Sequence, residues 1–589
     1  MKRVFYFLLL ISVCLSCKDG GTASNHDGEL PLDTDSHTDV QSSDSTGVIA
    51  NWDVVPYQIV DEPFNAGVVA FHEQGVTVTF YVNGKVVATS EAPAYNPRTD
   101  VWEYWFTLDP GQYTDGPLTL AATAGSDNGS ASQRTLTPII LYANASHTIA
   151  PASPVYVSPD GNDATGNGSV EDPYASIEKG FIKAGDGGTV YLQAGEYQLD
   201  VDAGAEQAFV YWTTITAAPG VARADVVIRG NGSTGSRFYQ PMVKFSNVSM
   251  YKDAETYAVV LRVRDGQHVW VENCDLYDAL GHHHGHETFG NEGGDLFVTD
   301  ALIRDIMNGS GGTLTRNVTY RNIGGDVFRA ASNLTAININ VENMDPAEDA
   351  HPDLIQFYHP DSTVSNVILY NVYATDMNAQ GIFGSDDGDG ATRDIAFVNI
   401  LFEKTAENYF KSQVGNMNHA LFWHITTVNH GMSVNSQSMR NCSVLNNAFF
   451  MLSDGEAVSM PDSDIRYNHY EKLNWNQTNG GMGVGYTTGD PLFRDTATRD
   501  FRLAEASPGY RSGTPLECVP ADIFGNEFDR VNPDIGAVSN TIRPPMPRGL
   551  RIHGPTASRA VPASMGSARH SPNSASALAA TAGGRRVGH

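Results

Sequence analysis

A short unit of one polar residue followed by apolar residues recurs through the middle of the chain. This repeat constrains the fold more than any other feature of the sequence. In the copy Asp353-Leu354-Ile355-Gln356, a carboxylate stands directly before a short apolar run. Successive copies begin 31, 27, 27 and 28 residues apart. The copies begin at Asp295, Asp326, Asp353, Gln380 and Asn408.

A second series of short strand-like segments runs between these copies, and each segment ends in asparagine. Two strand signals per repeat, recurring at least five times, predict a solenoid whose rungs are β-strands. Stacked rungs place equivalent residues in columns about 5 Å apart. The polar column 295/326/353/380/408 is therefore the first candidate for a functional site. The asparagines of the second series are Asn273, Asn322, Asn343, Asn371 and Asn429.

The short strands, Asn-ended turns and varying rung lengths over about 155–540 resemble the right-handed parallel β-helix proteins of the pectate-lyase-like superfamily. Within this region, 154–197 resembles the N-terminal capping segment of secreted bacterial β-helices, with a short amphipathic stretch at 175–184. Residues 489–537 resemble their C-terminal closing segment, which we expect over the last rung. The superfamily includes lyases, hydrolases, epimerases, esterases and adhesins, so the resemblance implies the fold and leaves the activity open. We expect the β-helix domain to span 152–540.

Residues 49–148 have a different pattern, which predicts a separate small domain. The segment 76–82 alternates apolar and polar residues and runs into Asn83-Gly84, a strong signal for a type I′ hairpin. About seven short strands are expected in this region, which favours an immunoglobulin-like β-sandwich. The predicted fold class is therefore all-β, a sandwich followed by a right-handed parallel β-helix. We favour a spacer role for the sandwich over weak carbohydrate binding.

The N-terminus has the pattern of a secretory signal. A positively charged start is followed by the apolar run 4–13, which is too short for a membrane anchor. The sequence Cys14-Leu15-Ser16-Cys17 resembles a bacterial lipobox, although Cys14 stands where an aliphatic residue is usual. We therefore predict a signal peptide at 1–17 with lipidation of Cys17, and ordinary cleavage near Ser16 is the alternative. The protein would be a cell-envelope lipoprotein or secreted, with a membrane contact through the lipid anchor only.

Two segments lack the apolar residues needed for a folded core. Residues 18–48 are rich in Asp, Ser, Thr and Gly, which predicts a disordered acidic linker. Residues 541–589 contain seven Arg, no Lys and no acidic residue, which predicts a disordered basic tail.

The charge of the chain limits the classes of ligand. The formal net charge is −30, and this balance argues against nucleic acid, whose phosphates need a basic surface. Carboxylate-rich turns suit Ca²⁺. An acidic polysaccharide would then need a local Arg or Lys patch, or bridging Ca²⁺. The simpler reading is that the acidity only keeps the surface soluble. We expect a monomer.

The polar column suggests chemistry at Asp326 and Asp353. If they lie on neighbouring rungs, the two carboxylates repel unless one is protonated, Ca²⁺ bridges them, or Arg329 neutralises them. Three positions further along lies a second expected column of Val298, Arg329, Gln356, Phe383 and Lys411. His351, two residues before Asp353, is a candidate proton shuttle.

Two reactions fit these residues. The resemblance implies β-elimination, in which Ca²⁺ or Arg neutralises a uronate and a base removes the adjacent proton. Arg329, Lys411 and His351 are the candidates for that base. The alternative is glycoside hydrolysis, in which Asp326 and Asp353 act as acid and base around a water. Gln356 and Gln380 are predicted to bind substrate. A third interpretation is a non-catalytic adhesin or glycan-binding protein, in which the column consists only of turn residues that cap the backbone.

Two polar loops are candidate accessory sites. The run His282-His283-His284-Gly285-His286-Glu287 does not have the spacing of a zinc motif, because neighbouring histidines of one loop seldom share an ion. Metal binding, lining of a substrate cleft (with His283 as a contact) and a plain exposed loop all stay open for it. Asp386 and Asp387 lie in an acidic turn that resembles a Ca²⁺ loop but lacks EF-hand spacing. They complete the predicted Ca²⁺ ligands, together with Asp326 and Asp353.

Overall fold

The computed structural model describes residues 47–540 apart from short gaps. The predicted signal peptide with Cys17, the linker up to residue 46 and the tail 541–589 lie outside the described residues. Within the described part, no helix is long and apolar enough to cross a membrane. The gaps are 127–131, 150–152, 202–208, 231–235, 254–258, 285–286, 347–350, 358–362, 385–391, 405–411, 435–438, 455–459, 461 and 475–482.

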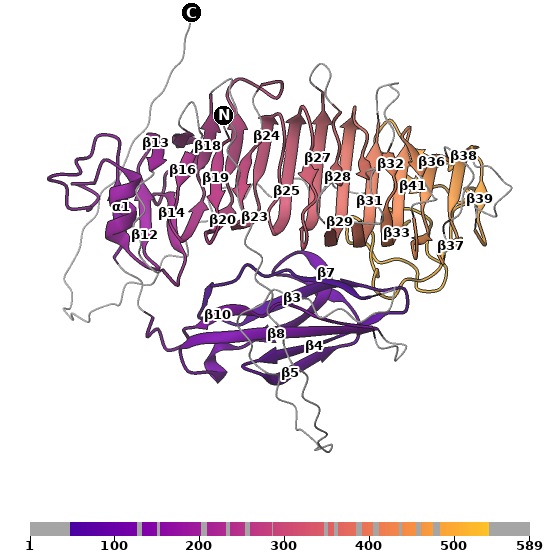
Figure 1. The fold of residues 1–589 in the computed structure, drawn as a ribbon, viewed down its shortest axis with the longest axis horizontal. Helices are drawn as coiled ribbons and strands as arrows, with labels where there is room; N and C mark the ends of the chain where they lie inside the picture. The colour runs from indigo at the N-terminus through magenta and orange to yellow at the C-terminus, as the bar shows by residue number, and fades with distance from the viewer. Residues whose placement is uncertain are drawn as a thin grey trace, which may run out of the picture. The chain divides into compact units, whose positions relative to one another are not determined.

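The first folded part is a β-sandwich of two mainly antiparallel sheets (Figure 1). Its strand β4 alternates between buried and half-buried side chains, as the sequence pattern predicted. Asn83 and Gly84 both have positive φ, 50° and 76°, as a type I′ turn requires. One sheet consists of β1 (Ile49–Trp52), β3 (Phe64–Phe71), β7 (Val101–Leu108) and β6 (Ala94–Asn96), and the other of β2 (Ile59–Val60), β10 (Ile139–Ala143), β8 (Gly116–Ser126), β4 (Val76–Val82), β5 (Lys85–Ser90) and β9 (Gln133–Thr135).

A short helix covers the start of the second part, as the capping prediction required. The helix α1 (Ile177–Ala184) begins after Ser176, whose side chain accepts a hydrogen bond from the Lys179 N–H at 3.2 Å. Ile177 and Phe181 are buried and face the first strands, β11 (Val155–Val157) and β12 (Thr189–Leu192). The helix therefore shields apolar side chains that the end of a solenoid would otherwise expose.

The strands after this cap pair in parallel, rung upon rung, and form three faces. The predicted fold class, a parallel β-helix preceded by an immunoglobulin-like sandwich, is confirmed. The first face contains β14 (Thr213–Ala217), β17 (Met242–Ser246), β20 (His268–Glu272), β23 (Asp295–Thr299) and the first halves of β25 (Leu314–Ile323), β27 (Thr335–Met344), β29 (Val364–Met377), β31 (Thr392–Glu403) and β33 (Met417–Val428), followed by β35 (Ser443–Leu445) and β37 (Asp464–Arg466).

The second face contains β15 (Val226–Gly230), β18 (Ser249–Lys252), β21 (Asp275–Asp278), β24 (Leu302–Ile306), the second halves of the five long strands, β36 (Ala448–Asp454) and β38 (His469–Asn474). The third face, called the open face below, contains β16 (Ser236–Phe238), β19 (Leu261–Arg264), β22 (Phe289–Glu292), β26 (Phe328–Arg329), β28 (Ile355–Phe357), β30 (Ile382–Gly384), β32 (Ser412–Val414) and β34 (Gly431–Val434).

Asparagines form the corner between the first two faces. Asn317, Asn338, Asn371 and Asn399 have positive φ, and each side-chain amide donates to the side chain of the previous rung's corner residue at 3.0 Å. Asn tolerates this backbone region better than most residues, and stacking satisfies its amide. The predicted Asn series is thus a set of corners, but it mixes two of them, because Asn343 stacks on Asn322 in a separate ladder.

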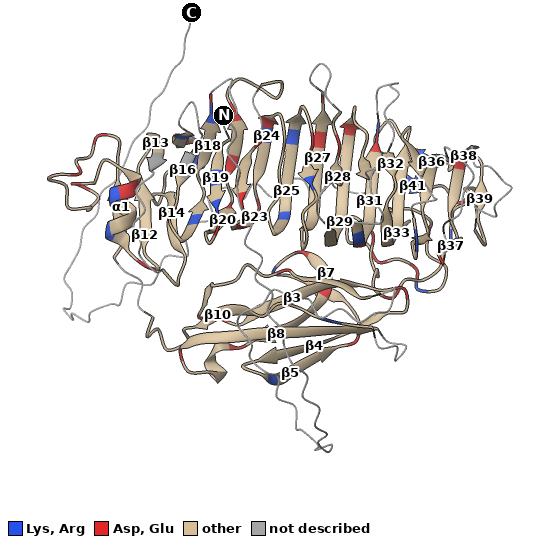
Figure 2. Cartoon of the chain, viewed as in Figure 1, with Lys and Arg blue, Asp and Glu red and all other residues tan. Residues whose placement is uncertain are grey.

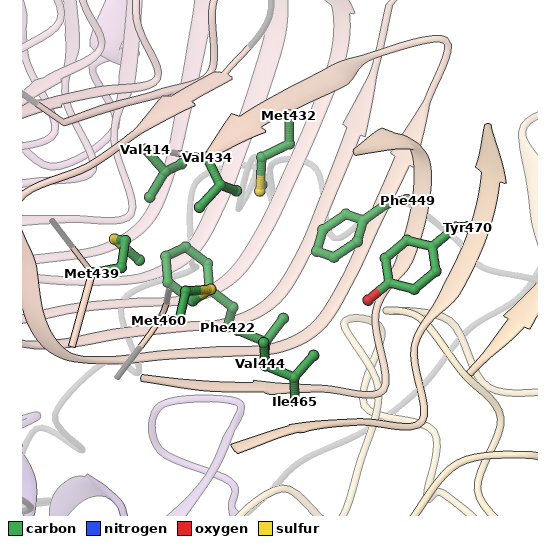
Figure 3. Close-up of a pocket in the computed structure, with 10 residues that line it drawn as sticks. All are labelled: Val414, Phe422, Met432, Val434, Met439, Val444, Phe449, Met460, Ile465 and Tyr470. Carbon is green, nitrogen blue, oxygen red and sulfur yellow. The ribbon is translucent and has the colours of Figure 1, made fainter. Parts of the chain in front are cut away.

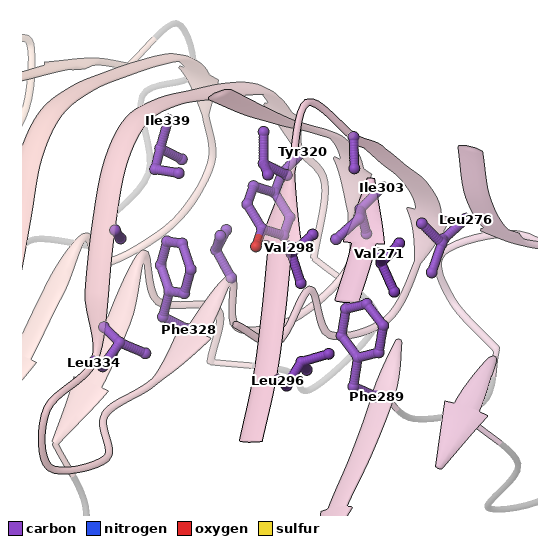
Figure 4. Close-up of a cluster of buried hydrophobic side chains, with 14 of the residues drawn as sticks. Val271, Leu276, Phe289, Leu296, Val298, Ile303, Tyr320, Phe328, Leu334 and Ile339 are labelled. Carbon is purple, nitrogen blue, oxygen red and sulfur yellow. The ribbon is translucent and has the colours of Figure 1, made fainter. Parts of the chain in front are cut away.

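Inward-facing apolar side chains fill the interior of the β-helix. Val298, Tyr320 and Phe328 come from different faces and meet in this core (Figure 4). Between the last rungs a cavity of about 20 Å³ remains, lined by side chains such as Met432 and Phe449 (Figure 3). A cavity this small and apolar stays dry, so it is not a candidate binding site.

Two other parts of the chain cover the first and second faces. The sandwich packs on the first face, where Phe71 lies 5.2 Å from the Tyr370 ring and the Trp212 indole N–H donates to the Pro56 carbonyl at 2.7 Å. The closing segment was expected over the last rung. Its apolar side chains instead pack against the side of earlier rungs, where Phe501 and Ile523 cluster with Leu401 on the second face.

Candidate functional site

The open face carries a row of outward side chains in strict register. Arg329 pairs with Gln356, Gln356 with Phe383, Phe383 with Gln413, and Gln413 with Ser433. Arg329 is exposed and the other four are half-buried. In the described part of the chain, apolar side chains of the sandwich and of the closing segment cluster with side chains of the other two faces. The open face is therefore the surface on which a ligand has room.

The register corrects both predicted columns. Val298 pairs with Thr315 on the first face, so it does not stand in line with Arg329. Asp295 likewise pairs with His268 on the first face and not with Asp326. At the other end Phe383 pairs with Gln413, so the row does not lead to Lys411. Lys411, Asn408, Asp386 and Asp387 all lie in stretches outside the described residues.

A polar ladder runs along the edge of the open face, just before its strands. The Asn308 side-chain oxygen accepts the Asp326 N–H at 2.8 Å, and Asp326 Oδ1 accepts the Asp353 N–H at 3.1 Å. The backbone adds a bond from the Val327 N–H to the Asp353 carbonyl at 2.8 Å. Asn308 and Asp326 therefore do cap the next rung, as the turn-residue interpretation requires.

Asp353 departs from this ladder. The next rung's Gln380 N–H donates to the Pro352 carbonyl at 2.8 Å, so the Asp353 carboxyl is left without that capping role. The residue has no exposed surface, and its Oδ1 has no hydrogen-bond partner among the residues the structure describes. Gln356 Nε2 lies 3.4 Å from Oδ2. Burial, and secondly the charge of Asp326, raise the pKa of Asp353 to about 9. At neutral pH this carboxyl is a proton donor.

Asp326 is the member of this pair that contacts a positive charge. Burial raises the pKa of Asp326 above its ordinary value, and the charge and hydrogen bond of Arg329 only partly oppose that rise. Arg329 Nε lies 3.3 Å from Asp326 Oδ2, and its Nη1 lies 2.6 Å from Glu287 Oε1. The Arg329 side chain is 56% exposed, whereas that of Asp326 is 7% exposed. Two buried carboxyl groups and a solvent-facing guanidinium therefore meet at one point.

The other predicted site residues lie in different surroundings. Gln380 is 5% exposed, so its predicted role in substrate binding is not supported by its position. His351 is exposed in the loop that leads into β28. His283 lies beside Asp345. The sequence had not marked Asn308, because it does not begin a polar-then-apolar repeat, and it had named Glu287 only as the end of the histidine run.

The predicted calcium ligands Asp326 and Asp353 do not fit a calcium ion. Ca²⁺ takes six or more oxygen ligands, and ionised carboxylates dominate such sites. Asp353 has no exposed surface, and the oxygens of Asp326 already accept from the Asp353 N–H and Arg329. Arg329 supplies a positive charge beside Asp326, which is one of the three alternatives that the sequence left open. No step in the chemistry below is therefore routed through calcium.

Charge is otherwise spread over the β-helix. Acidic and basic positions are interspersed along its strands and are not gathered in one basic patch (Figure 2). An anionic ligand would therefore depend on individual arginines, such as the exposed Arg329 beside the polar ladder.

Comparison with known proteins adds two structural likenesses. No protein-family profile and no curated protein matches the chain. A crystal structure of pectate lyase Pel9A is similar with 13% sequence identity and a TM-score of 0.23, over 66% of this chain and 96% of that one. A rhamnogalacturonan lyase is similar with 11% identity and a TM-score of 0.25, over 58% and 87%. At these TM-scores neither likeness carries an argument, and the strand pairings establish the fold by themselves.

Fold and site together define a class: a parallel β-helix protein with a buried carboxyl pair and an exposed arginine at the edge of its open face.

Proposed function

We propose that this chain is a carbohydrate-active enzyme that cleaves an acidic polysaccharide on the open face of the β-helix. The observation that carries the proposal is the buried Asp353, whose pKa is raised to about 9, next to Asp326 and the exposed Arg329. Carboxyl groups whose pKa values are pushed apart are the arrangement that acid–base catalysis uses. The lipobox-like N-terminus supports a place in the cell envelope, with the enzyme held by a lipid on Cys17.

The first candidate reaction is β-elimination at a uronic acid. In this scheme the uronate carboxylate takes the place of Glu287 on Arg329, which neutralises it and makes the adjacent C–H more acidic. Glu287, released from Arg329, or the exposed His351 then accepts that proton. The bond to the leaving sugar oxygen breaks and a carbon–carbon double bond forms. Asp353 has no exposed surface, so in this scheme its proton reaches the leaving oxygen through one intervening water.

Hydrolysis is the second candidate, and the pairing of Asp353 with Asp326 favours it. Here the proton of Asp353, again passed on through a water, reaches the glycosidic oxygen while a carboxylate activates a second water, without any need for a uronate. The two reactions share Asp353 as acid and differ in their products. Elimination creates an ultraviolet-absorbing unsaturated sugar, whereas hydrolysis creates new reducing ends alone.

The test is to incubate the full chain with uronic-acid and neutral polysaccharides and to follow both ultraviolet absorbance and reducing ends. Asp353→Asn removes the proton but keeps the shape, so we expect kcat to fall about 10²- to 10⁴-fold. Asp305→Asn, at a corner beside the second face, is the matched control and should keep its activity. Full activity of Asp353→Asn would exclude the acid role, and no cleavage of any polymer would leave the glycan-binding interpretation ahead.

A further inference from the structure

Two adjacent histidines and a distant aspartate converge on one point outside the polar ladder. His282 Nε2 lies 3.1 Å from Asp345 Oδ2, and His283 Nε2 lies 3.6 Å from the same oxygen. The two imidazole rings stand 4.1 Å apart at a steep angle of 68°. One ligand atom from each of the three residues falls within 4.8 Å of the others.

The fold holds both sides of this cluster in place. His282 and His283 lie in the turn after β21, which is tied down by a bond from the Leu280 N–H to the buried Asp278 carboxylate at 2.9 Å. Asp345 follows β27 directly, and its N–H donates to the Ile323 carbonyl at 3.0 Å. Gly324 lets the turn approach, because a Cβ at this position would stand 2.0 Å from the His282 carbonyl oxygen.

We propose that His282, His283 and Asp345 bind one divalent transition-metal ion of the zinc class. Zinc bonds to His nitrogen and carboxylate oxygen are about 2.0–2.2 Å long. Two ligand atoms of one tetrahedral ion therefore stand about 3.3–3.5 Å apart. The two distances to Asp345 Oδ2, 3.1 and 3.6 Å, lie on either side of that value. Two imidazoles and one carboxylate suit zinc and its neighbours, whereas Ca²⁺ prefers oxygen ligands alone.

The side chains of the proposed metal site are accessible to solvent, as those of a reactive metal centre are. The side chains of His282, His283 and Asp345 are 23%, 45% and 52% exposed. Three protein ligands leave a fourth tetrahedral position for water or a ligand oxygen, as in catalytic zinc sites. The same loop leads on to Glu287, the partner of Arg329. The metal site does not depend on the proposed cleavage reaction.

The test is titration of the full chain, stripped with a chelator, with Zn²⁺ by calorimetry and with Co²⁺ by visible absorbance. We expect His282→Ala, His283→Ala and Asp345→Asn each to lose one equivalent of binding that the parent chain has. The affinity for this metal ion should fall at least about tenfold. Even the loss of a residue that only hydrogen-bonds to a metal ligand has an effect of that size. A tetrahedral Co²⁺ spectrum should disappear with it.

His284→Ala is the matched control, because it removes a neighbouring histidine of the same turn that lies outside the cluster. Circular dichroism and thermal melting of each metal-free variant check that the fold is kept. Asp345→Asn changes the charge of the side chain but keeps its shape, so the turn around it should be preserved. Equal binding by the parent and all four variants would show that the cluster is only a hydrogen-bonded group. Binding of Ca²⁺ but not Zn²⁺ at one equivalent would also overturn the proposal.

Discussion

Two arginine–aspartate pairs of this protein have the same chemistry and opposite surroundings. Arg316 pairs with Asp53 of the sandwich, and these side chains are 8% and 0% exposed. Arg329 pairs with Asp326 on the edge of the open face, and its own side chain is 56% exposed. The first pair lies between two packed parts of the chain, while the second lies on the face that they leave free.

The difference separates a structural role from a binding role. A buried arginine cannot exchange its partner for a ligand, and removing that partner leaves an uncompensated charge in a poorly hydrated place. An exposed arginine can exchange partners at little cost because water screens it. Arg329 already divides its contacts between Asp326 and Glu287. Arg329 is therefore the one of the two that can take a substrate anion.

The largest effect should come from breaking the buried pair. Arg316→Met keeps the length of the side chain but removes the guanidinium that is bonded to the buried Asp53 carboxyl, so we expect a loss of about 3–5 kcal/mol in the free energy of unfolding. Urea denaturation measures the change. The control is Arg321→Met on the same strand, β25, whose ion pair with Glu342 is partly exposed and should matter by at most about 1 kcal/mol. Equal losses in the two variants would contradict the contrast drawn here.

The sequence predicted the fold from local signals that repeat. The Asn83-Gly84 turn, the helix after Ser176 and the asparagine corners are each decided by a few neighbouring residues, so they could be read directly. The two ends of the predicted polar column could not be derived from the sequence. Every face of a β-helix repeats with a similar period, so Asp295 looked equivalent to Asp326 although it lies on another face.

Contacts between distant residues were beyond the sequence. Nothing near Arg316 indicates that Asp53, 263 residues away, neutralises it. The same holds for Asp345 beside His282, which the histidine run alone could not supply. The unusual state of Asp353 also depends on burial under neighbouring rungs, although its place next to Asp326 was predicted correctly.

A second prediction concerns Asp353, the buried carboxyl next to the pair of Arg329 and Asp326. The pKa of Asp353 is about 9 in the folded chain and near 3.9 when unfolded, so the folded state binds one more proton between these values. Stability contributed by this group is complete below about pH 4 and is lost as the pH rises towards 9, by roughly 1 kcal/mol per pH unit. Asp353→Asn should remove that slope.

The measurement is the difference in unfolding free energy between the parent chain and Asp353→Asn from pH 5 to pH 8, a range chosen inside that window. Taking the difference cancels other raised acids such as Glu103, whose pKa is about 8. We expect the variant to gain on the parent as the pH rises. A constant difference would mean that Asp353 is ionised and already paired, and the proton-donor role would then be lost.

The smallest expected change is the most specific test of the comparison. Arg329→Met should alter the free energy of unfolding by at most about 1 kcal/mol, because its guanidinium is largely hydrated. It should nevertheless weaken retention on an immobilised uronic-acid polymer and leave retention on a neutral polymer unchanged. Retention of the parent should also fall with added salt. Arg321→Met, whose arginine side chain is also partly exposed but lies on another face, should behave like the parent on both polymers. If Arg329→Met instead destabilises the fold as much as Arg316→Met, Arg329 has the same structural role on the open face as Arg316 has on the covered face, and the contrast between the two pairs is wrong.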